Sequence, residues 1–310
     1  MFKICCILPY FGKFPNYFPL WLKSCGKNDN IDFLLITDND IPIDLPVNFI
    51  YKKYSFKELK QKIQSKFDFS ICMNAPYKLC DFKPAYGEIF SSELNNYDFW
   101  GYIDCDLILG NSRHYLTAEK LEQYDKLYTH GHFTLFRNID KLNLIYRNLD
   151  FKRVFTSKYV FHFDEWGGIS SYLKKINKIK QYDGYDMADI NAAKYRFHHA
   201  SSFGNFPQIF EYNGGTLTCI YREHEEIKKA ERFYIHFQKR PMSLFIDNLD
   251  DNYLIVPNKF ISVNENAERL LKDQEEERIY WHWYKVRAKQ IIENVRNGAI
   301  KQRLEKNLHG

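Results

Sequence analysis

The sequence predicts an α/β protein, and three observations lead to this fold class. Apolar runs of strand length, such as residues 4–8, 33–37 and 99–103, end in polar or turn-forming residues. Helical patterns lie between these runs, one at residues 55–67 that opens on a capping box and one at residues 84–94. The chain has 310 residues, 17% of them aromatic, so it can bury a substantial core and is unlike a disordered protein.

Composition narrows the class of protein. The seven cysteines form no C-x-x-C pair and are odd in number, which favours a reducing compartment. The net charge of +5 is modest and spread along the chain, which argues against a nucleic-acid binder and leaves anionic small substrates or an anionic membrane surface open. No signal-like start and no apolar stretch of about 18 residues is present. We therefore expect a cytoplasmic protein.

The first two apolar runs end in residues suited to a nucleotide. Ligands of open α/β sheets bind beyond the carboxyl ends of the strands. The first run ends at Pro9, Tyr10 and Phe11, which are placed to cover a base. The second ends at Asp38, which could accept hydrogen bonds from a base or ribose, although a turn carboxylate is the alternative.

A basic segment precedes the central apolar run. Pro84 fits the first turn of a helix that continues to about Leu94, with a bend just before it. Lys78, Asp81 and Lys83 then gather at a helix start, where ammonium groups and the helix dipole suit a diphosphate. An ordinary charged helix face with an i,i+3 pair is the competing interpretation.

The central apolar run, residues 99–103, is followed directly by two carboxylates, Asp104 and Asp106, with Cys105 between them. Carboxylates that are two residues apart lie on one side of an extended backbone and can converge on a hard divalent cation. Mg2+ and Mn2+ prefer such oxygens and keep positions open for phosphate. The alternative is a solvated strand end with an Asx turn.

Two further segments carry candidate site residues. Asp164 and Glu165 stand before a helical pattern at residues 169–176, where a carboxylate at a cleft could act as a general base. The helix dipole alone could also explain two acids there. An apolar run then carries His236, followed by Lys239, which offers an imidazole for a metal and an ammonium for phosphate.

The last third of the chain contains a hairpin pattern, with Gly214 and Gly215 at its turn, and then a charged segment that predicts a short helix. From Asn264 the composition changes to a Glu-rich stretch, the aromatic residues 280–284 and a basic amphipathic helix to about Leu304. Such a tail could pack on the preceding domain, mediate association into a homodimer, or rest on a membrane surface.

The order of these motifs resembles GT-A fold glycosyltransferases, and most closely the bacterial polysaccharide type of capsule and O-antigen loci. The resemblance implies a Rossmann-like mixed sheet that binds a nucleotide sugar. It also implies that Asp104 and Asp106, which flank Cys105 in a DxD motif, coordinate Mn2+ or Mg2+ on the diphosphate of a UDP-sugar. His236 matches a metal-binding histidine of related enzymes, and Lys239 a basic residue that holds the diphosphate.

The resemblance covers residues 1–245, which we expect to be the catalytic domain, with a mainly helical extension over residues 246–310. The chain departs from the longer motif of related enzymes, because Gln238 stands between His236 and Lys239 where a glycine is usual, and Arg240 follows Lys239.

The resemblance implies transfer of a hexosyl group, galactose or galactofuranose, from a UDP-sugar to a hydroxyl of a growing, lipid-linked surface polysaccharide. We expect inversion with Asp164 or Glu165 as the base. A nucleotidyltransferase is the first alternative, although the loop after the first strand lacks the expected glycine-rich, basic pattern. A non-catalytic carbohydrate- or lipid-binding protein is the second.

Overall fold

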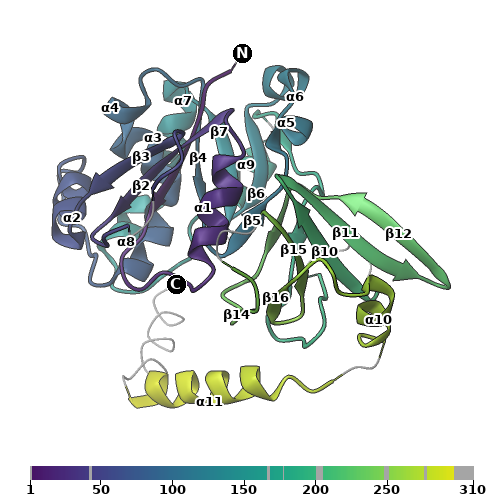
Figure 1. The fold of residues 1–310 in the computed structure, drawn as a ribbon. Coiled ribbons are helices and arrows are strands. Elements are labelled where there is room, and N and C mark those ends of the chain that lie inside the picture. Colours follow the sequence, from purple (N-terminus) through teal and green to yellow (C-terminus); the bar gives the residue numbers. More distant parts are fainter. Residues whose placement is uncertain are drawn as a thin grey trace.

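The computed structural model describes residues 2–41, 44–165, 168–176, 178–199, 205–247, 251–275 and 278–296. Figure 1 shows a sheet flanked by helices, a second sheet beside it, and a last helix, α11, along the lower edge. The predicted α/β class is confirmed.

The first sheet has seven strands and is mixed. Its four consecutive strands β3, β2, β1 and β4 are parallel, whereas β7 is antiparallel to β4. The carboxyl ends of the parallel strands therefore meet at one edge, where such sheets bind ligands. In spatial order the strands are β3 (Phe49–Lys53), β2 (Ile31–Thr37), β1 (Ile4–Pro9), β4 (Phe99–Ile103), β7 (Phe133–Arg137), β6 (Lys126–His130) and β8 (Gln181–Tyr182).

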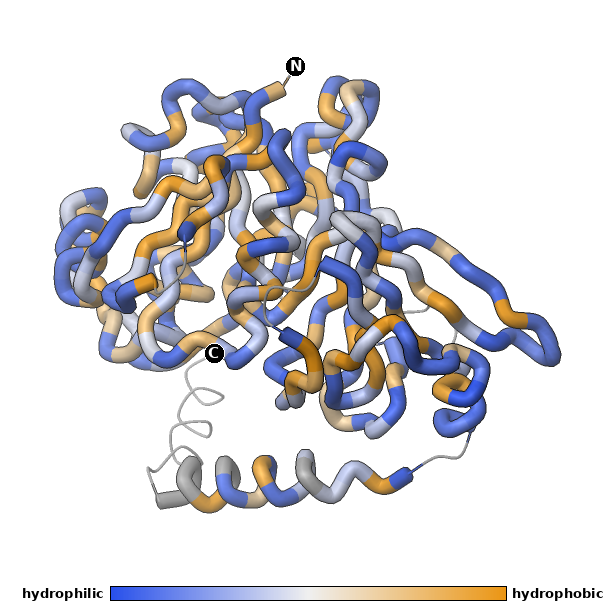
Figure 2. Tube along the Cα trace, in the orientation of Figure 1, coloured by the Kyte–Doolittle hydropathy of each residue, from blue (hydrophilic) through white to orange (hydrophobic). Residues whose placement is uncertain are grey.

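Both faces of the central strands β2, β1, β4 and β7 are buried, which explains why these strands are apolar without alternation. Cys5 and Ile7 of β1 pack on one side, and Cys6 and Leu8 on the other. Figure 2 shows the hydrophobic interior of the sheet between more hydrophilic helices. The first side is covered by α2 (Phe56–Gln64), the 3-10 helix η1 (Pro76–Ala85), α3 (Tyr86–Ile89), α4 (Ser91–Leu94), α7 (Asp140–Asn143), η2 (Ile145–Asn148), α8 (Phe151–Thr156) and α9 (Ile169–Ile176); the second by α1 (Phe18–Gly26), α5 (Ser112–Tyr115) and α6 (Ala118–Gln123).

The second sheet has six strands, and its core hairpin follows the predicted turn. Gly214 and Gly215 both have positive φ, 56° and 113°, a backbone conformation that glycine adopts without steric cost. In spatial order the strands are β12 (Glu226–Glu231), β11 (Thr216–Glu223), β10 (Gln208–Asn213), β15 (Asn252–Val256), β16 (Lys259–Ile261) and β14 (Ser243–Leu244).

A small third sheet joins distant parts of the chain. In it β13 (Tyr234–His236) pairs antiparallel with β5 (Leu107–Leu109) and parallel with β9 (Ala188–Asp189). The residues that follow β4 are thus held beside the strand that carries His236.

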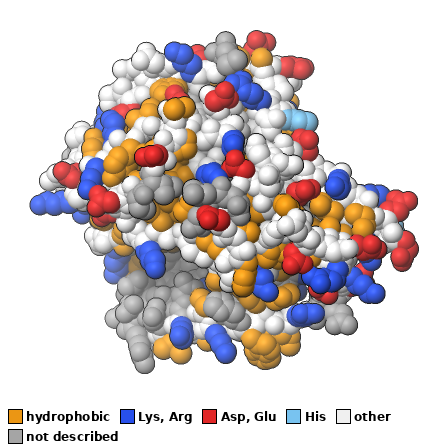
Figure 3. Space-filling view, in the orientation of Figure 1, with side chains coloured by type: hydrophobic (Ala, Val, Ile, Leu, Met, Phe, Trp, Pro, Cys, Tyr) orange, Lys and Arg blue, Asp and Glu red, His pale blue; other side chains and the backbone are white. Residues whose placement is uncertain are grey.

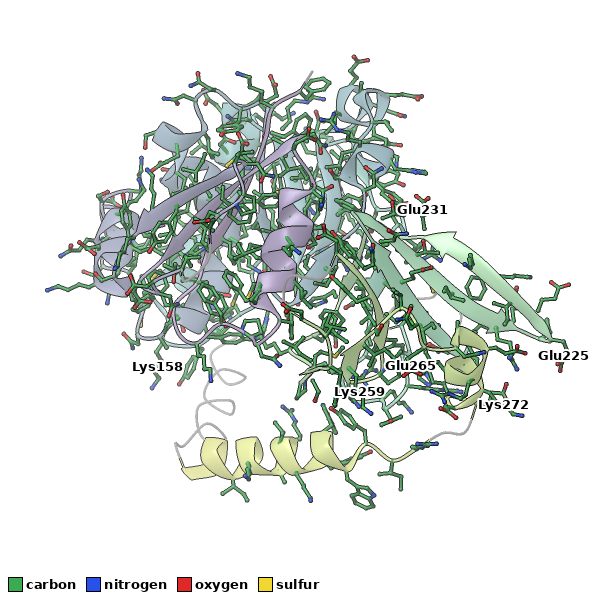
Figure 4. All side chains as sticks on the ribbon, in the orientation of Figure 1. Lys158, Glu225, Glu231, Lys259, Glu265 and Lys272 are labelled. Carbon is green, nitrogen blue, oxygen red and sulfur yellow. The ribbon has the colours of Figure 1, made fainter. Side chains whose placement is uncertain are left out.

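Two segments differ from the expected helices. The predicted helix at residues 84–94 is interrupted: η1 ends at Ala85, and α3 and α4 are separated at Phe90, whose φ of −106° and ψ of 23° lie outside the helical range. The charged segment after β11 is the edge strand β12, whose hydrogen bonds to β11 outweigh its helical pattern. Figure 4 shows Glu225 and Glu231 pointing away from this sheet, as is usual for a solvent-facing edge.

The expected boundary at residue 245 falls inside the second sheet, because β15 pairs with β10. The helical part begins later, with α10 (Ala267–Lys272) and α11 (Trp281–Arg296). The expected continuation to Leu304 lies outside the described residues. Within the described ranges no helix is both long and apolar enough to cross a membrane. All seven cysteines fall in these ranges and are free thiols.

Candidate functional site

A cavity of about 1010 Å3 opens at the carboxyl edge of the parallel strands. The ends of β1, β4 and β13 line it, together with η1, the end of β6 with its turn at residues 131–132, and the loop at residues 162–165. Its volume lies at the upper end of the range typical of small-molecule sites. Most of the residues that sequence analysis selected reach this cavity.

Asp104, Asp106 and His236 come together in the cavity. Asp104 follows β4, Asp106 precedes β5, and His236 ends β13, so the pairing of β13 with β5 brings the imidazole to the carboxylates. One ligand atom from each residue lies within 4.8 Å of the others. Two carboxylates and an imidazole could hold a divalent cation such as Mn2+ or Mg2+, and the nitrogen ligand favours Mn2+.

The backbone after β13 holds Asp106 in place. Gln238 and Lys239 both have left-handed φ, 50° and 59°, so the chain turns sharply after His236. This turn aims the backbone N–H of Lys239 at Oδ2 of Asp106, with an N···O distance of 2.6 Å. The backbone N–H of Phe237 donates to the carbonyl oxygen of Asp106 at 2.8 Å. The carboxylate is thus positioned by peptide groups rather than by side chains alone.

Asp189 orients the imidazole of His236. Its Oδ1 lies 2.8 Å from Nδ1 of His236 and also accepts a hydrogen bond from Nε2 of Gln238 at 3.0 Å. Nε2 of His236 consequently faces Asp106, 3.4 Å from its Oδ1. A carboxylate behind a histidine is the usual partner of a metal-binding imidazole, because it fixes the tautomer that presents the other nitrogen.

The charges of this cluster depend on one another. Burial lowers the pKa of His236, but the carboxylates of Asp106 and Asp189 outweigh burial and raise it to about 10. Burial raises the pKa of both carboxyls, yet hydrogen bonds and the charge of His236 bring each pKa well below its usual range. Without a cation, a protonated His236 balances the two acids.

His132 stacks on His236 with ring centroids 4.0 Å apart, and His130 stacks on its far side at 5.2 Å. Neither ring nitrogen of His132 has a hydrogen-bond partner among the described residues. Burial, with the nearby charge of His236, lowers the pKa of His132 well below its usual range. The ring is therefore neutral and supports His236 by packing. It lies close enough to Asp189 and His236 to form a second set of potential ligands.

Lys83 links Asp104 to the acid predicted as a base. Its Nζ lies 2.8 Å from Oδ1 of Asp104 and 3.4 Å from Oδ2 of Asp164, and it donates to the carbonyl oxygen of Gly131 at 2.7 Å. Burial lowers the pKa of Lys83, but the two carboxylates raise it well above its usual range. The lysine is thus a fixed positive charge in the wall of the cavity.

Asp164 and Glu165 both line the cavity, but their surroundings differ. Asp164 is 2% exposed, whereas Glu165 is partly exposed. Burial raises the pKa of Asp164 to about 7, against the opposing charge of Lys83 and with support from Glu165. A carboxyl with such a pKa can accept a proton near neutral pH. Gly131 makes room for this pair, because a Cβ there would lie 2.5 Å from Oε1 of Glu165.

Aromatic residues also line the cavity. Pro9, Tyr10 and Phe11 line it at the end of β1, and Tyr10 is fixed by stacking on Phe14 at 4.7 Å. Nζ of Lys239 lies 4.2 Å from the ring centroid of Tyr77, so an ammonium group also reaches the cavity. Cys105 touches the cavity but packs in the hydrophobic core, where burial raises the pKa of its thiol.

Three selected residues do not reach the cavity. Asp38 is exposed at the end of β2, outside the lining. Lys78 and Asp81 form a buried ion pair at 2.7 Å that fastens the loop before α9: Lys78 donates to the carbonyl oxygen of Val154 at 2.8 Å, and Asp81 accepts from the backbone N–H of Phe161 at 3.0 Å. The expectation that Lys78 and Asp81 face a diphosphate is corrected, since the i,i+3 pair serves the fold.

Sequence analysis missed Asp189, Tyr77 and Gly131. Asp189 belongs to a two-residue strand without a motif, and its place beside His236 follows only from the parallel pairing of β9 with β13. No sequence signal of its own could have selected it. Gly131 directly precedes His132 and could have been noticed as a glycine that ends an apolar strand.

Comparison with known proteins gives a family and distant similarity to solved structures. A family model described as "Family of unknown function (DUF6625)" matches residues 6–264. No curated protein matches the chain. The crystal structure of the glycosyltransferase GlyE in Streptococcus pneumoniae TIGR4 is similar over 60% of this chain and 45% of that chain, with 14% identity and a TM-score of 0.31. The chain thus spans less than half the length of that protein.

Proposed function

The chain belongs to the DUF6625 family of unknown function, and we propose that it is a metal-dependent glycosyltransferase that uses a UDP-sugar. The observation that carries this proposal is the meeting of Asp104, Asp106 and His236 in a large cavity at the carboxyl edge of a parallel sheet. Aromatic residues line the same cavity and buried Lys83 contacts Asp104, which suits a base and a diphosphate.

Asp104, Asp106 and His236 would hold Mn2+ or Mg2+, which when bound neutralises negative charge that builds on a leaving diphosphate. Asp189 keeps Nε2 of His236 turned toward Asp106. Lys239, at the mouth beside Tyr77, adds an ammonium for phosphate oxygens. Tyr10 and Phe11 would cover the uracil.

Asp164 is the base in this proposal. Asp164 lines the cavity, where its carboxylate would accept the proton of the acceptor hydroxyl. The hydroxyl oxygen forms the new bond to the anomeric carbon as the bond to the diphosphate breaks, so the product is inverted. The pKa of about 7 suits this transfer, and Glu165 is the second choice because it is more exposed.

The motif order that resembles polysaccharide-type enzymes supports the finer part of the proposal. The donor sugar is galactose, in pyranose or furanose form, and the acceptor is a lipid-linked surface polysaccharide assembled at the cytoplasmic side of a membrane. Fold-level likeness cannot choose a sugar, so this part is tested by substrate screening.

Calorimetry with UDP, GDP, CMP and dTDP, each with and without Mn2+, tests the proposal. We expect UDP to bind only with Mn2+, and Asp106→Asn to abolish that binding. Asp38→Asn is the matched control, because it removes an exposed carboxylate outside the cavity. Release of UDP from UDP-galactose or UDP-galactofuranose then tests the reaction. Nucleotide binding that does not depend on Mn2+ would refute the metal-dependent enzyme. If none of the four nucleotides binds, the proposal is also refuted, and a carbohydrate-binding protein is favoured.

A further inference from the structure

Helix α11 begins next to a packed residue, Tyr280, and many of its own side chains are exposed. Tyr280, directly before the helix, is 8% exposed, and its ring centroid lies 5.2 Å from Cζ of Arg240 and 6.1 Å from the ring centroid of Tyr195. From there α11 runs along the lower edge of the molecule, apart from the sheets (Figure 1). The anchor fixes where the helix begins, and the exposed residues beyond it form a separate surface.

Four exposed residues of α11 share one face, whereas exposed Val286 lies outside it. Trp281, Tyr284 and Ile292 are 65%, 53% and 51% exposed, and Ala288 is exposed between them. They follow the spacing i, i+3, i+7 and i+11, which at 100° per residue keeps them within about 80° of one another. We call these four residues the apolar stripe. An aromatic pair at its start is typical of helices that lie at a membrane–water interface.

Basic residues border the apolar stripe on both sides. Lys285 and Lys289 follow one side and Arg287 the other, and all three are exposed. Between Arg278 and Arg296 the sequence holds five basic residues and one acidic residue. Figure 3 shows hydrophobic and basic side chains together at the edge where α11 lies.

We propose that α11 binds the surface of an anionic phospholipid bilayer. The apolar stripe enters the boundary between head groups and acyl chains, while Lys285 and Lys289 meet lipid phosphates. Charge favours this occupant over a second copy of the chain, because two copies joined along the stripe would bring their lysines together with a single acidic residue per helix to balance them. This inference does not depend on the proposed glycosyltransferase activity.

Flotation of the full chain with vesicles tests the proposal. We expect binding to phosphatidylcholine vesicles that contain about one third phosphatidylglycerol, weak binding to phosphatidylcholine alone, and release as salt is raised. Each lysine near an anionic surface contributes about fivefold, so Lys285→Gln with Lys289→Gln should weaken binding about 25-fold. Lys57→Gln with Lys141→Gln removes two exposed lysines from distant helices and should leave binding unchanged.

A second variant, Trp281→Ser with Tyr284→Ser and Ile292→Ser, should lower vesicle binding at least tenfold while circular dichroism and nucleotide binding stay the same. All three side chains are exposed, so folding does not depend on them. The proposal is overturned if the unaltered chain does not float with anionic vesicles, or if the control pair loses as much binding as the α11 pair. It is equally overturned if light scattering shows that the stripe variant turns a dimer into a monomer without changing vesicle binding.

Discussion

Asp189→Asn tests whether the carboxylate behind His236 prepares it for a metal. Oδ1 of Asp189 accepts hydrogen bonds from His236 at 2.8 Å and Gln238 at 3.0 Å, in a site where Asp189 is only 9% exposed. An asparagine keeps an acceptor of the same shape but loses the charge, and charge-assisted hydrogen bonds are about twice as strong as neutral ones. Loss of such a partner weakens metal binding about 10- to 100-fold, or about 1.4–2.7 kcal/mol.

Calorimetric titration with Mn2+, in the absence of nucleotide, measures this loss directly. Asp183→Asn is the control, because Asp183 is an exposed acid in the same segment that accepts a hydrogen bond from Thr129 and none from His236. Thermal unfolding of both variants checks that the fold survives. The reasoning is refuted if Asp189→Asn binds Mn2+ within about threefold of the unaltered chain, well below the expected loss, or if the control loses as much affinity.

Three further predictions concern buried charges and a glycine. Lys78→Met leaves Asp81 charged and unpaired in the core, so urea unfolding should show a loss of about 3–5 kcal/mol, and a loss below about 1 kcal/mol would contradict the role of the pair. Folding raises the pKa of Asp164 from 3.8 to about 7, so between these pH values the folded state binds more protons than the unfolded state. The free energy of unfolding should therefore fall as pH rises through this window, by at most about 4 kcal/mol. Asp164→Asn should flatten that fall, and an equally steep curve would contradict the raised pKa. Gly131→Ala places a Cβ 2.8 Å from Oδ2 of Asp164, so sugar transfer should drop more than tenfold, by the misplacement of a reacting group, while Mn2+ binding remains; unchanged turnover would show that the carboxylates need no such space.

Local sequence patterns predicted the parts of the fold that are stabilised by contacts between residues close together in the sequence. The capping box of Ser55 and Glu58 marks the start of α2, and the Gly214–Gly215 turn sets the β10–β11 hairpin. The strand β12 is mistaken for a helix because its sequence is mostly charged and lacks apolar–polar alternation, and only pairing with β11 decides its conformation.

The metal-ligand part of the site was predictable, because carboxylates and imidazoles are the side chains that commonly bind divalent cations. Asp104, Asp106 and His236 could be selected as potential ligands, and the structure brings them within 4.8 Å. Lys78 could not be placed, because an i,i+3 ion pair looks the same in sequence whether it faces a ligand or the core. Asp189 could not be found at all, since its position comes from a strand pairing between residues 47 apart.

The link between Asp106 and Lys239 joins positions 133 residues apart in the chain. A nascent chain that has completed β5 already carries Asp104 and Asp106, but it has neither the imidazole of His236 nor the peptide group that holds Asp106. Cation capture should therefore arise late, when the final third of the chain docks, and affinity for manganese would then report the completion of folding. Fragments that end before β13 should bind no manganese even if their first sheet is well formed.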